Sequence, residues 1–98
     1  MNRDDAIGRI KPAEPALRAL GVAHLYLFGS TARNEATAAS DIDIFIDKDP
    51  AKPFGMVEFF NIAELLQNAL GTKVDFTTRD ALHPVLRADI ERSAIQVL

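Results

Sequence analysis

Three short runs rich in β-branched and aromatic residues constrain the fold of this chain more than any other feature. They cover residues 22–28, 41–47 and 72–78, and runs of this length and composition are typical of strands. Around them, apolar residues recur at helical spacing, which predicts the order helix, strand, short helix, strand, helix, strand, helix. Residues 94–98 fit either a last strand or a frayed helix end. The pattern predicts a two-layer α+β or α/β domain.

Prolines and glycines mark the expected ends of these elements. Pro12 and Pro15 fall inside the first helical segment and predict a break in it. Gly21 and Gly71 follow helical segments and are expected to terminate them. Pro84 is expected near the start of the last helix, because proline is favoured in a first helical turn.

Length and charge exclude several classes of protein. The 98 residues suffice for one domain, spanning 1–98. A net charge of −3 argues against sequence-independent binding to nucleic acid, which needs a basic surface. The chain has no cysteine, which excludes disulfides and thiolate metal sites. Its apolar runs are too short for a membrane span, and Met1–Asp5 lacks the apolar core of a signal peptide. A cytoplasmic location without membrane contact is therefore expected.

Chemistry-bearing residues gather at the ends of the three predicted strands. Gly29 and Ser30 close the first strand, Asp41 and Asp43 share one face of the second, and Asp75 lies in the third. If these strands are neighbours, the three carboxylates converge on one edge of the sheet. Like charges a few ångströms apart raise one another's pKa, and hard divalent cations relieve that repulsion. Two metal ions about 3.5–4 Å apart fit between such carboxylates.

The residues around this cluster suit a phosphate-bearing ligand. Gly29 allows the backbone to approach closely, and Ser30 offers a hydroxyl and an amide at a helix N-terminus. Arg33, one turn further on, adds a planar fork for phosphate oxygens. The third carboxylate, Asp75, can bridge a metal ion or accept a proton from an attacking hydroxyl. A nucleoside triphosphate with Mg²⁺ matches this set.

The spacing of these residues resembles a known signature. The segment 27–33 contains Gly29-Ser30 and ends in Thr-Ala-Arg. Ten residues after Gly29-Ser30, the segment 40–44 contains the pair Asp41-x-Asp43. This resembles the DNA polymerase β-like nucleotidyltransferase superfamily, with Asp75 in the place of its third acidic residue. The short length and the closing segment 82–90 resemble the minimal nucleotidyltransferases. The resemblance implies an α+β, two-layer fold with a small mixed β-sheet packed with helices.

Many minimal nucleotidyltransferases are antitoxins encoded beside a HEPN-type ribonuclease toxin. The resemblance therefore implies a Mg²⁺-dependent transfer of AMP from ATP to a hydroxyl, in particular a tyrosine of a partner HEPN toxin. It implies two Mg²⁺ ions at Asp41, Asp43 and Asp75, with Asp75 acting as or near the general base. The alternative is a non-catalytic antitoxin of the same fold that neutralises its toxin by direct binding.

The resemblance also implies which residues hold the triphosphate: Gly29, Ser30 and Arg33. One departure is Asn34, where close relatives usually carry glycine. Asparagine tolerates the left-handed backbone conformation better than most residues, so the turn is expected to survive. A salt bridge to Glu35 that only braces the loop is the alternative role for Arg33.

Other polar and aromatic residues have simpler explanations. Asp41 and Asp43 could also be charges that protect an edge strand. Asp47 and Asp49 precede a proline and are expected to be solvated turn residues. The remaining candidates are expected to be core aromatics or capping and surface histidines, namely Phe54, Phe59, Phe60, His24 and His83.

Overall fold

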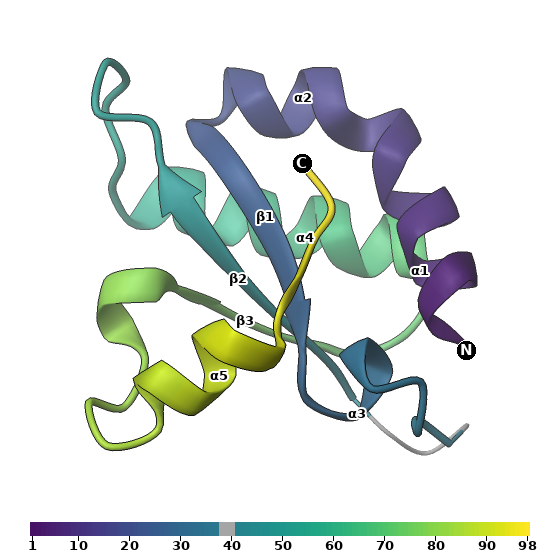
Figure 1. The fold of residues 1–98 in the computed structure, drawn as a ribbon. Helices are drawn as coiled ribbons and strands as arrows, with labels where there is room; N and C mark the ends of the chain where they lie inside the picture. The colour runs from purple at the N-terminus through teal and green to yellow at the C-terminus, as the bar shows by residue number, and fades with distance from the viewer. Residues whose placement is uncertain (38–40) are drawn as a thin grey trace.

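The computed structural model describes residues 1–37 and 41–98. Helices and strands follow the predicted order along the chain (Figure 1). The helices are α1 (Arg3–Ile10), α2 (Glu14–Ala19), α3 (Gly29–Ala32), α4 (Met56–Leu70) and α5 (Arg87–Ser93), with 3-10 turns η1 (Lys11–Ala13) and η2 (Arg79–Ala81). The strands are β1 (Val22–Phe28), β2 (Ile42–Lys48), β3 (Val74–Thr78) and β4 (Ile95–Gln96).

The strands form one mixed sheet in the order β3-β2-β1-β4. β1 pairs antiparallel with both β2 and β4, whereas β2 and β3 run parallel. Parallel neighbours need a crossover connection, and α4 supplies it between β2 and β3. The three strands that were predicted to carry the acidic and Gly-Ser residues are therefore direct neighbours.

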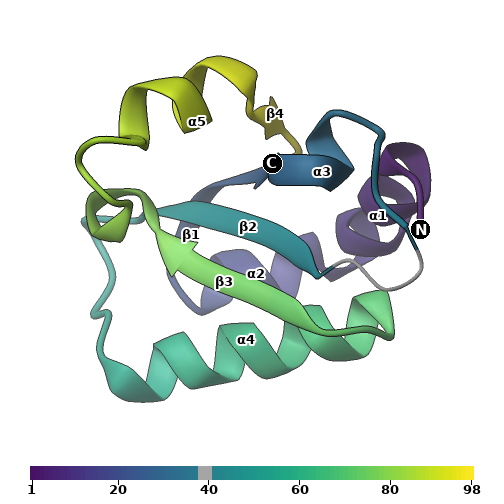
Figure 2. The same cartoon turned by 90° about the horizontal axis from the view of Figure 1, so that it is seen from below.

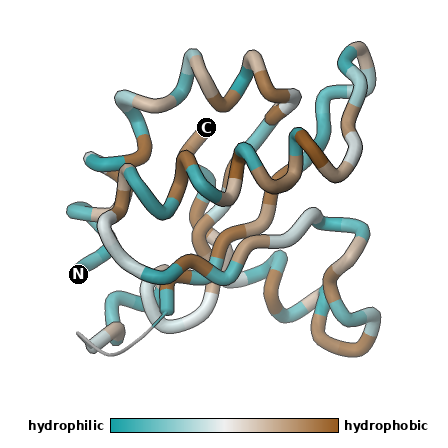
Figure 3. Tube along the Cα trace, turned by 180° about the vertical axis from the view of Figure 1, so that it is seen from behind, coloured by the Kyte–Doolittle hydropathy of each residue, from teal (hydrophilic) through white to brown (hydrophobic). Residues whose placement is uncertain are grey.

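Helices cover the sheet unequally. α1, α2 and α4 lie against one face, and α5 lies over the other (Figure 2). The core forms on the first face, where the isoleucines of β2 meet α4; its central members are Ile42, Ile44, Ile46, Ile62, Leu66 and Leu70. Apolar residues recur along α4 at the spacing that such packing requires (Figure 3). The predicted two-layer architecture with a small mixed sheet is confirmed.

Most predicted ends are confirmed. The prolines break the first helix, with η1 separating α1 from α2. Gly21 and Gly71 adopt positive φ angles of 103° and 68° directly after helical segments, a conformation that glycine adopts without strain. The end of the chain is a short strand, β4, rather than a frayed helix.

The last helix begins later than Pro84. The backbone N–H groups of Leu86 and Arg87 both donate to the carbonyl of His83, at 2.9 Å each. Nδ1 of His83 also accepts from the N–H of Val85, at 3.2 Å. His83 therefore organises a turn, a capping role as predicted, and α5 starts only at Arg87.

Phe60 is not a core residue, contrary to the prediction. It lies on the outer side of α4 and is 59% exposed, whereas Phe54 and Phe59 are half-buried. In the part of the chain that the structure describes, no helix is both long and apolar enough to cross a membrane.

Candidate active site

Two carboxylates lie side by side across neighbouring strands. Asp43 of β2 pairs with Asp75 of β3 in the parallel register, and with Phe28, the last residue of β1, in the antiparallel register. Residues paired in register point to the same face of a sheet. Asp41 precedes β2 by one residue. The structure therefore brings the end of β1, the start of β2 and the start of β3 to one place.

The backbone of Gly29 packs directly against the side chain of Asp43. Its φ angle is 68°, and a Cβ atom at this position would overlap Oδ2 of Asp43 and lie 3.2 Å from Cγ. Both the backbone conformation and the lack of space call for glycine. The turn between β1 and α3 is thereby pressed against the carboxylate of β2, so Gly29 and Ser30 lie beside the acidic residues.

The carboxylate cluster is electrostatically strained. Burial raises the pKa of Asp43, and the neighbouring charges of Asp75 and Asp41 raise it further, while the charge of Arg33 opposes them. A cation placed among these carboxylates would relieve both the desolvation and the repulsion.

Arg33 contacts its neighbours on both sides. Its Nε atom lies 3.2 Å from Oε2 of Glu35, and both side chains are exposed. Its backbone N–H donates to the carbonyl of Gly29, at 3.2 Å. The local ion pair is thus present, and the same side chain lies close enough to act on Asp43. An exposed pair of this kind is weak, so a phosphate can compete for Arg33.

Asn34 follows in the left-handed region, with φ at 60°. Its Oδ1 accepts from the backbone N–H of Arg3, at 3.2 Å. The expectation that asparagine maintains the turn here is confirmed. Ser40, which belongs to the matched motif, lies outside the described residues.

Asp41 has a partner that the sequence did not suggest. Nζ of Lys73 lies 3.7 Å from Oδ2 of Asp41, with the lysine side chain 78% exposed. Among residues 1–37 and 41–98, no group of three or more His, Cys, Asp or Glu side chains is assembled to hold a metal ion. The donor set is nonetheless the one that hard cations prefer, all carboxylate oxygens at one place. The charge of Asp41 acts on Asp43 together with that of Asp75, so the three carboxylates are close enough to repel one another.

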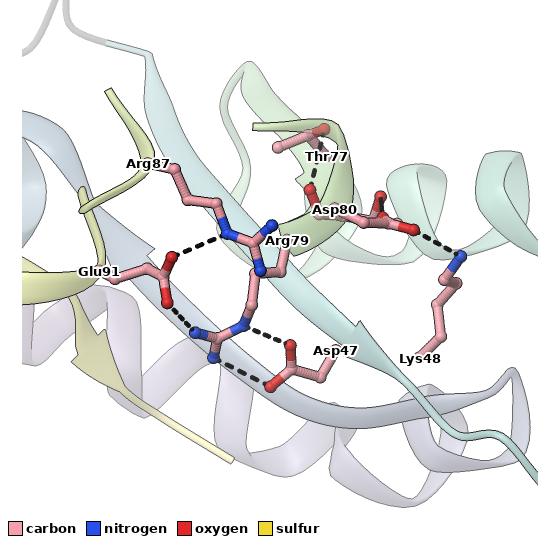
Figure 4. A network of polar contacts seen from close by, with 8 residues as sticks. Asp47, Lys48, Thr77, Arg79, Asp80, Arg87 and Glu91 are labelled. Carbon is pink, nitrogen blue, oxygen red and sulfur yellow. Dashed lines mark hydrogen bonds and ion pairs between the residues drawn. The ribbon is translucent and has the colours of Figure 1, made fainter. Parts of the chain in front are cut away.

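A second polar network lies further along the same strands (Figure 4). Arg79 donates to both carboxylate oxygens of Asp47, at 2.6 and 3.0 Å, and to Glu91 of α5, at 2.7 Å. Its guanidinium lies over the stacked rings of Tyr26 and Phe45. Hydrogen bonds raise the pKa of Arg79. This network ties β2, η2 and α5 together over the sheet face that carries Asp43.

The prediction that Asp47 is a solvated turn residue is therefore wrong. Asp47 belongs to β2, and its partner Arg79 is 32 positions away, so no local pattern reveals the pair. Asp49 does act in a turn, because its Oδ1 accepts from the backbone N–H of Ala51, at 2.9 Å. His24 is exposed in β1, as expected.

A cavity of about 570 Å³ lies at the other end of β3. Phe54, Met56, Phe59 and an ion pair between Lys48 and Asp80, at 3.1 Å, line it. Thr78, which also lines the cavity, lies three positions after Asp75 along β3, a rise of about 10 Å. The cavity is therefore distinct from the carboxylate cluster.

Comparisons with known proteins agree with this geometry. A family model described as nucleotidyltransferase domain matches residues 10–97. A Methanocaldococcus jannaschii protein, provisionally named a protein adenylyltransferase, is 39% identical over 77 residues, which are 78% of this chain and 77% of that protein. A solved structure, provisionally named a minimal nucleotidyltransferase, superposes with a TM-score of 0.83 at 26% identity, covering 97% of this chain and 95% of its own.

The fold also occurs in a toxin–antitoxin complex. A chain in the solved complex of a tri-AMPylated Shewanella oneidensis HEPN toxin with an MNT antitoxin matches with a TM-score of 0.63. The match covers 92% of this chain and 69% of that chain. At 23% identity the similarity concerns the fold alone.

Proposed function

The chain belongs to the nucleotidyltransferase domain family, and from this premise we propose that it transfers AMP from ATP to a hydroxyl group of a partner protein. The pairing in register of Asp43 and Asp75, beside Gly29, is the observation that carries the proposal. Protein adenylyltransferase is also the provisional name of the 39% identical relative.

The transfer uses residues of three strand ends. Gly29, Ser30 and Arg33 hold the triphosphate, with backbone N–H groups at the start of α3 and the guanidinium directed at phosphate oxygens. The acceptor oxygen forms a bond to the α-phosphorus while the bond from that phosphorus to the β-phosphate oxygen breaks. Asp75 accepts the hydroxyl proton, and pyrophosphate leaves.

Asp41, Asp43 and Asp75 would hold Mg²⁺, because they supply the hard oxygen donors that this ion prefers. When bound, two such ions would neutralise the charge that develops on the phosphate and the leaving group. The raised pKa of Asp43 supports this assignment, since a cation relieves the conditions that raise it.

The acceptor that we propose is a tyrosine of a HEPN ribonuclease toxin. The chain would then act as an antitoxin in the cytoplasm. It would consist of one minimal nucleotidyltransferase domain spanning 1–98. The same fold in a complex with an AMPylated HEPN toxin supports this choice of partner. The chain's net charge of −3 supports a protein rather than a nucleic acid as the macromolecule that it modifies.

The test is transfer of label from α-³²P-ATP with Mg²⁺ onto the cognate HEPN protein. Wild-type chain and the exposed-site control Asp89→Asn should label the partner, whereas Asp43→Asn and Asp75→Asn should not. A stable complex that silences the partner without any label would instead support neutralisation by binding alone. Full labelling by Asp43→Asn would contradict the assignment of the site.

A further inference from the structure

β3 is an edge strand whose outer side carries unpaired backbone groups. Among the described strands it pairs only with β2. The N–H of Ile42 donates to the carbonyl of Lys73, at 3.2 Å. This bond shows which backbone N–H and C=O groups of β3 point towards β2. Because backbone groups alternate along a strand, those of Asp75 and Thr77 point to β2, and those of Val74 and Phe76 point to the open edge.

The open edge is neither covered nor protected by the usual backbone devices. In Figure 2, no helix or strand among the described residues passes in front of β3. The segment Val74–Thr78 contains no proline, and its pairing with β2 runs without a bulge. Proteins commonly use a cover, a proline or a bulge to prevent pairing at such an edge. The edge of β3 is therefore available to another chain.

We propose that the acceptor polypeptide adds to β3 as an extended strand, which brings its hydroxyl side chain onto the sheet face that carries Asp43 and Asp75. This inference rests on the proposed function and specifies how its protein substrate is bound. Backbone hydrogen bonds to Val74 and Phe76 would hold the acceptor, as in other cases of strand addition. The occupant is an extended segment because only a backbone can pair with a row of N–H and C=O groups.

Strand addition fixes which acceptor side chains reach the carboxylates. The residue directly opposite Asp75 lies on its face, with Cβ atoms about 4.5–5.5 Å apart, and diagonal neighbours lie about 7–8 Å away. A serine or threonine can thus react from the opposite position, and a tyrosine from a diagonal one. Neighbouring acceptor residues point to the other face of the sheet.

On that other face the acceptor would meet exposed aromatic surface. Phe76 of β3 packs against Phe59 of α4, with ring centroids 4.7 Å apart, and Phe60 contacts Phe59 edge-on at 5.7 Å. Phe60 is thus a 59% exposed ring beside the Phe59–Phe76 contact between α4 and β3. An acceptor with apolar residues on either side of its hydroxyl residue would cover Phe60 and gain affinity.

The edge of β3 could instead pair with β3 of a second copy of this chain. Such a pairing would cover the approach to Asp75, which the proposed transfer needs open to a partner. The oligomeric state of the chain separates the two occupants. A dimer that Val74→Pro dissociates would assign the edge to self-association and overturn the inference.

The direct test uses a short synthetic peptide copied from the segment of the HEPN partner that carries the label. A series of peptides is made, each with one backbone N-methyl group at a different residue, and the rate of AMP transfer is measured for each peptide. Strand pairing predicts an alternating pattern, in which methylation at every second residue lowers the rate about tenfold or more and methylation in between has no effect. Loss that depends only on distance from the hydroxyl residue would overturn the inference.

A second test changes the edge itself. Val74→Pro removes an N–H that β2 does not use, at the first position of the strand, where proline is tolerated. Its transfer to the intact partner should fall about tenfold, whereas the control Val74→Ala should keep transfer within about twofold. Both variants should still show the rise in Tm that ATP with Mg²⁺ causes in the wild type. Equal transfer by both variants would contradict strand addition.

The outcomes distinguish the inference from the proposed function. If the wild type labels no partner, the proposed function fails, and the inference fails with it. If the wild type labels the partner but neither the alternating pattern nor the loss in Val74→Pro is found, only the inference fails.

Discussion

The backbone of Gly29 lies so close to the carboxylate of Asp43 that a side chain at position 29 would overlap Oδ2. The positive φ angle of Gly29 turns the chain from β1 into α3 at this contact. The turn between β1 and α3 and the carboxylate of Asp43 are thus packed against each other, so a side chain at position 29 would displace Asp43.

Gly29→Ala should destabilise the fold by about 1–2 kcal/mol from the left-handed conformation alone, and should also displace Asp43. The matched control is Gly8→Ala, in the middle of α1 with no atom within 4 Å of the added Cβ. That variant should be stabilised by about 0.5–1 kcal/mol. Urea denaturation measures both, and a Gly29→Ala variant as stable as the wild type would refute the packing described here.

Asp43→Asn should raise the Tm at pH 7 in the absence of divalent cations. The pKa of Asp43 is raised in the folded state, so its charged form opposes folding above that pKa. The penalty shrinks as the pH falls below the raised folded pKa and is gone below the unfolded value of 3.8, where the carboxyl is protonated in both states. The Tm difference between variant and wild type should therefore shrink on acidification. A constant difference from pH 7 to pH 4 would exclude this explanation.

Arg79→Ala should cost about 2–3 kcal/mol of stability, because it leaves the half-buried Asp47 without its partner. Glu91 would keep its ion pair with Arg87. It also removes a cation from the faces of Tyr26 and Phe45. Arg92→Ala is the matched control, since Arg92 pairs with Asp89 in full solvent exposure and should cost no more than about 0.5 kcal/mol. Similar losses for both variants would show that the Arg79 network does not stabilise the fold.

Acid should destabilise the contact between α5 and the sheet. Hydrogen bonds from Arg87 and Arg79 lower the pKa of Glu91 in the folded state. The stability that these bonds contribute is present above the unfolded pKa, near 4.5, and is lost as the pH falls through the lower folded pKa. Glu91→Gln should therefore lower the Tm at neutral pH and flatten its dependence between pH 5 and pH 3. An unchanged pH profile would argue against this assignment.

Arg33→Ala should weaken the binding of ATP with Mg²⁺ about tenfold, since charge-assisted hydrogen bonds to phosphate are lost. Loss of its exposed pair with Glu35 should change stability by less than about 1 kcal/mol. Arg18→Ala removes a comparable exposed pair, with Glu14, and should leave the affinity for ATP unchanged. Calorimetric titration measures both affinities. Equal affinities in the two variants would limit Arg33 to bracing the loop.

Local patterns predicted most of the fold. Prolines and glycines locate the ends of helices because their backbone restrictions act at the residue itself, as at Gly21 and Gly71. The start of α5 differs from the expectation because the residues after His83 first form a turn, which hydrogen bonds to the His83 carbonyl and Nδ1 hold. The exposure of Phe60 differs from the prediction because an apolar residue beside the apolar face of a helix does not reveal how far the sheet covers that face.

The sequence predicts the parts of the candidate site whose residues lie within one motif. It does not predict contacts between residues that are far apart in sequence. Gly29, Asp41 and Asp43 follow a fixed spacing. The pairing of Asp47 with Arg79 and of Asp41 with Lys73 depends on the parallel register of β2 and β3, which no short-range pattern encodes. The free edge of β3 likewise follows only from the strand order.

Transfer of AMP to a protein hydroxyl by the cluster around Asp43 would change the mass of the partner protein. The most direct measurement is the intact mass of the cognate HEPN partner after incubation with ATP, Mg²⁺ and either wild-type chain or Asp43→Asn. We expect the partner to gain AMP with the wild type, with one pyrophosphate released from ATP for each AMP gained, and to stay unmodified with Asp43→Asn. A partner that gains no mass although the wild-type chain binds it would refute transfer at this site, and so would equal modification by Asp43→Asn.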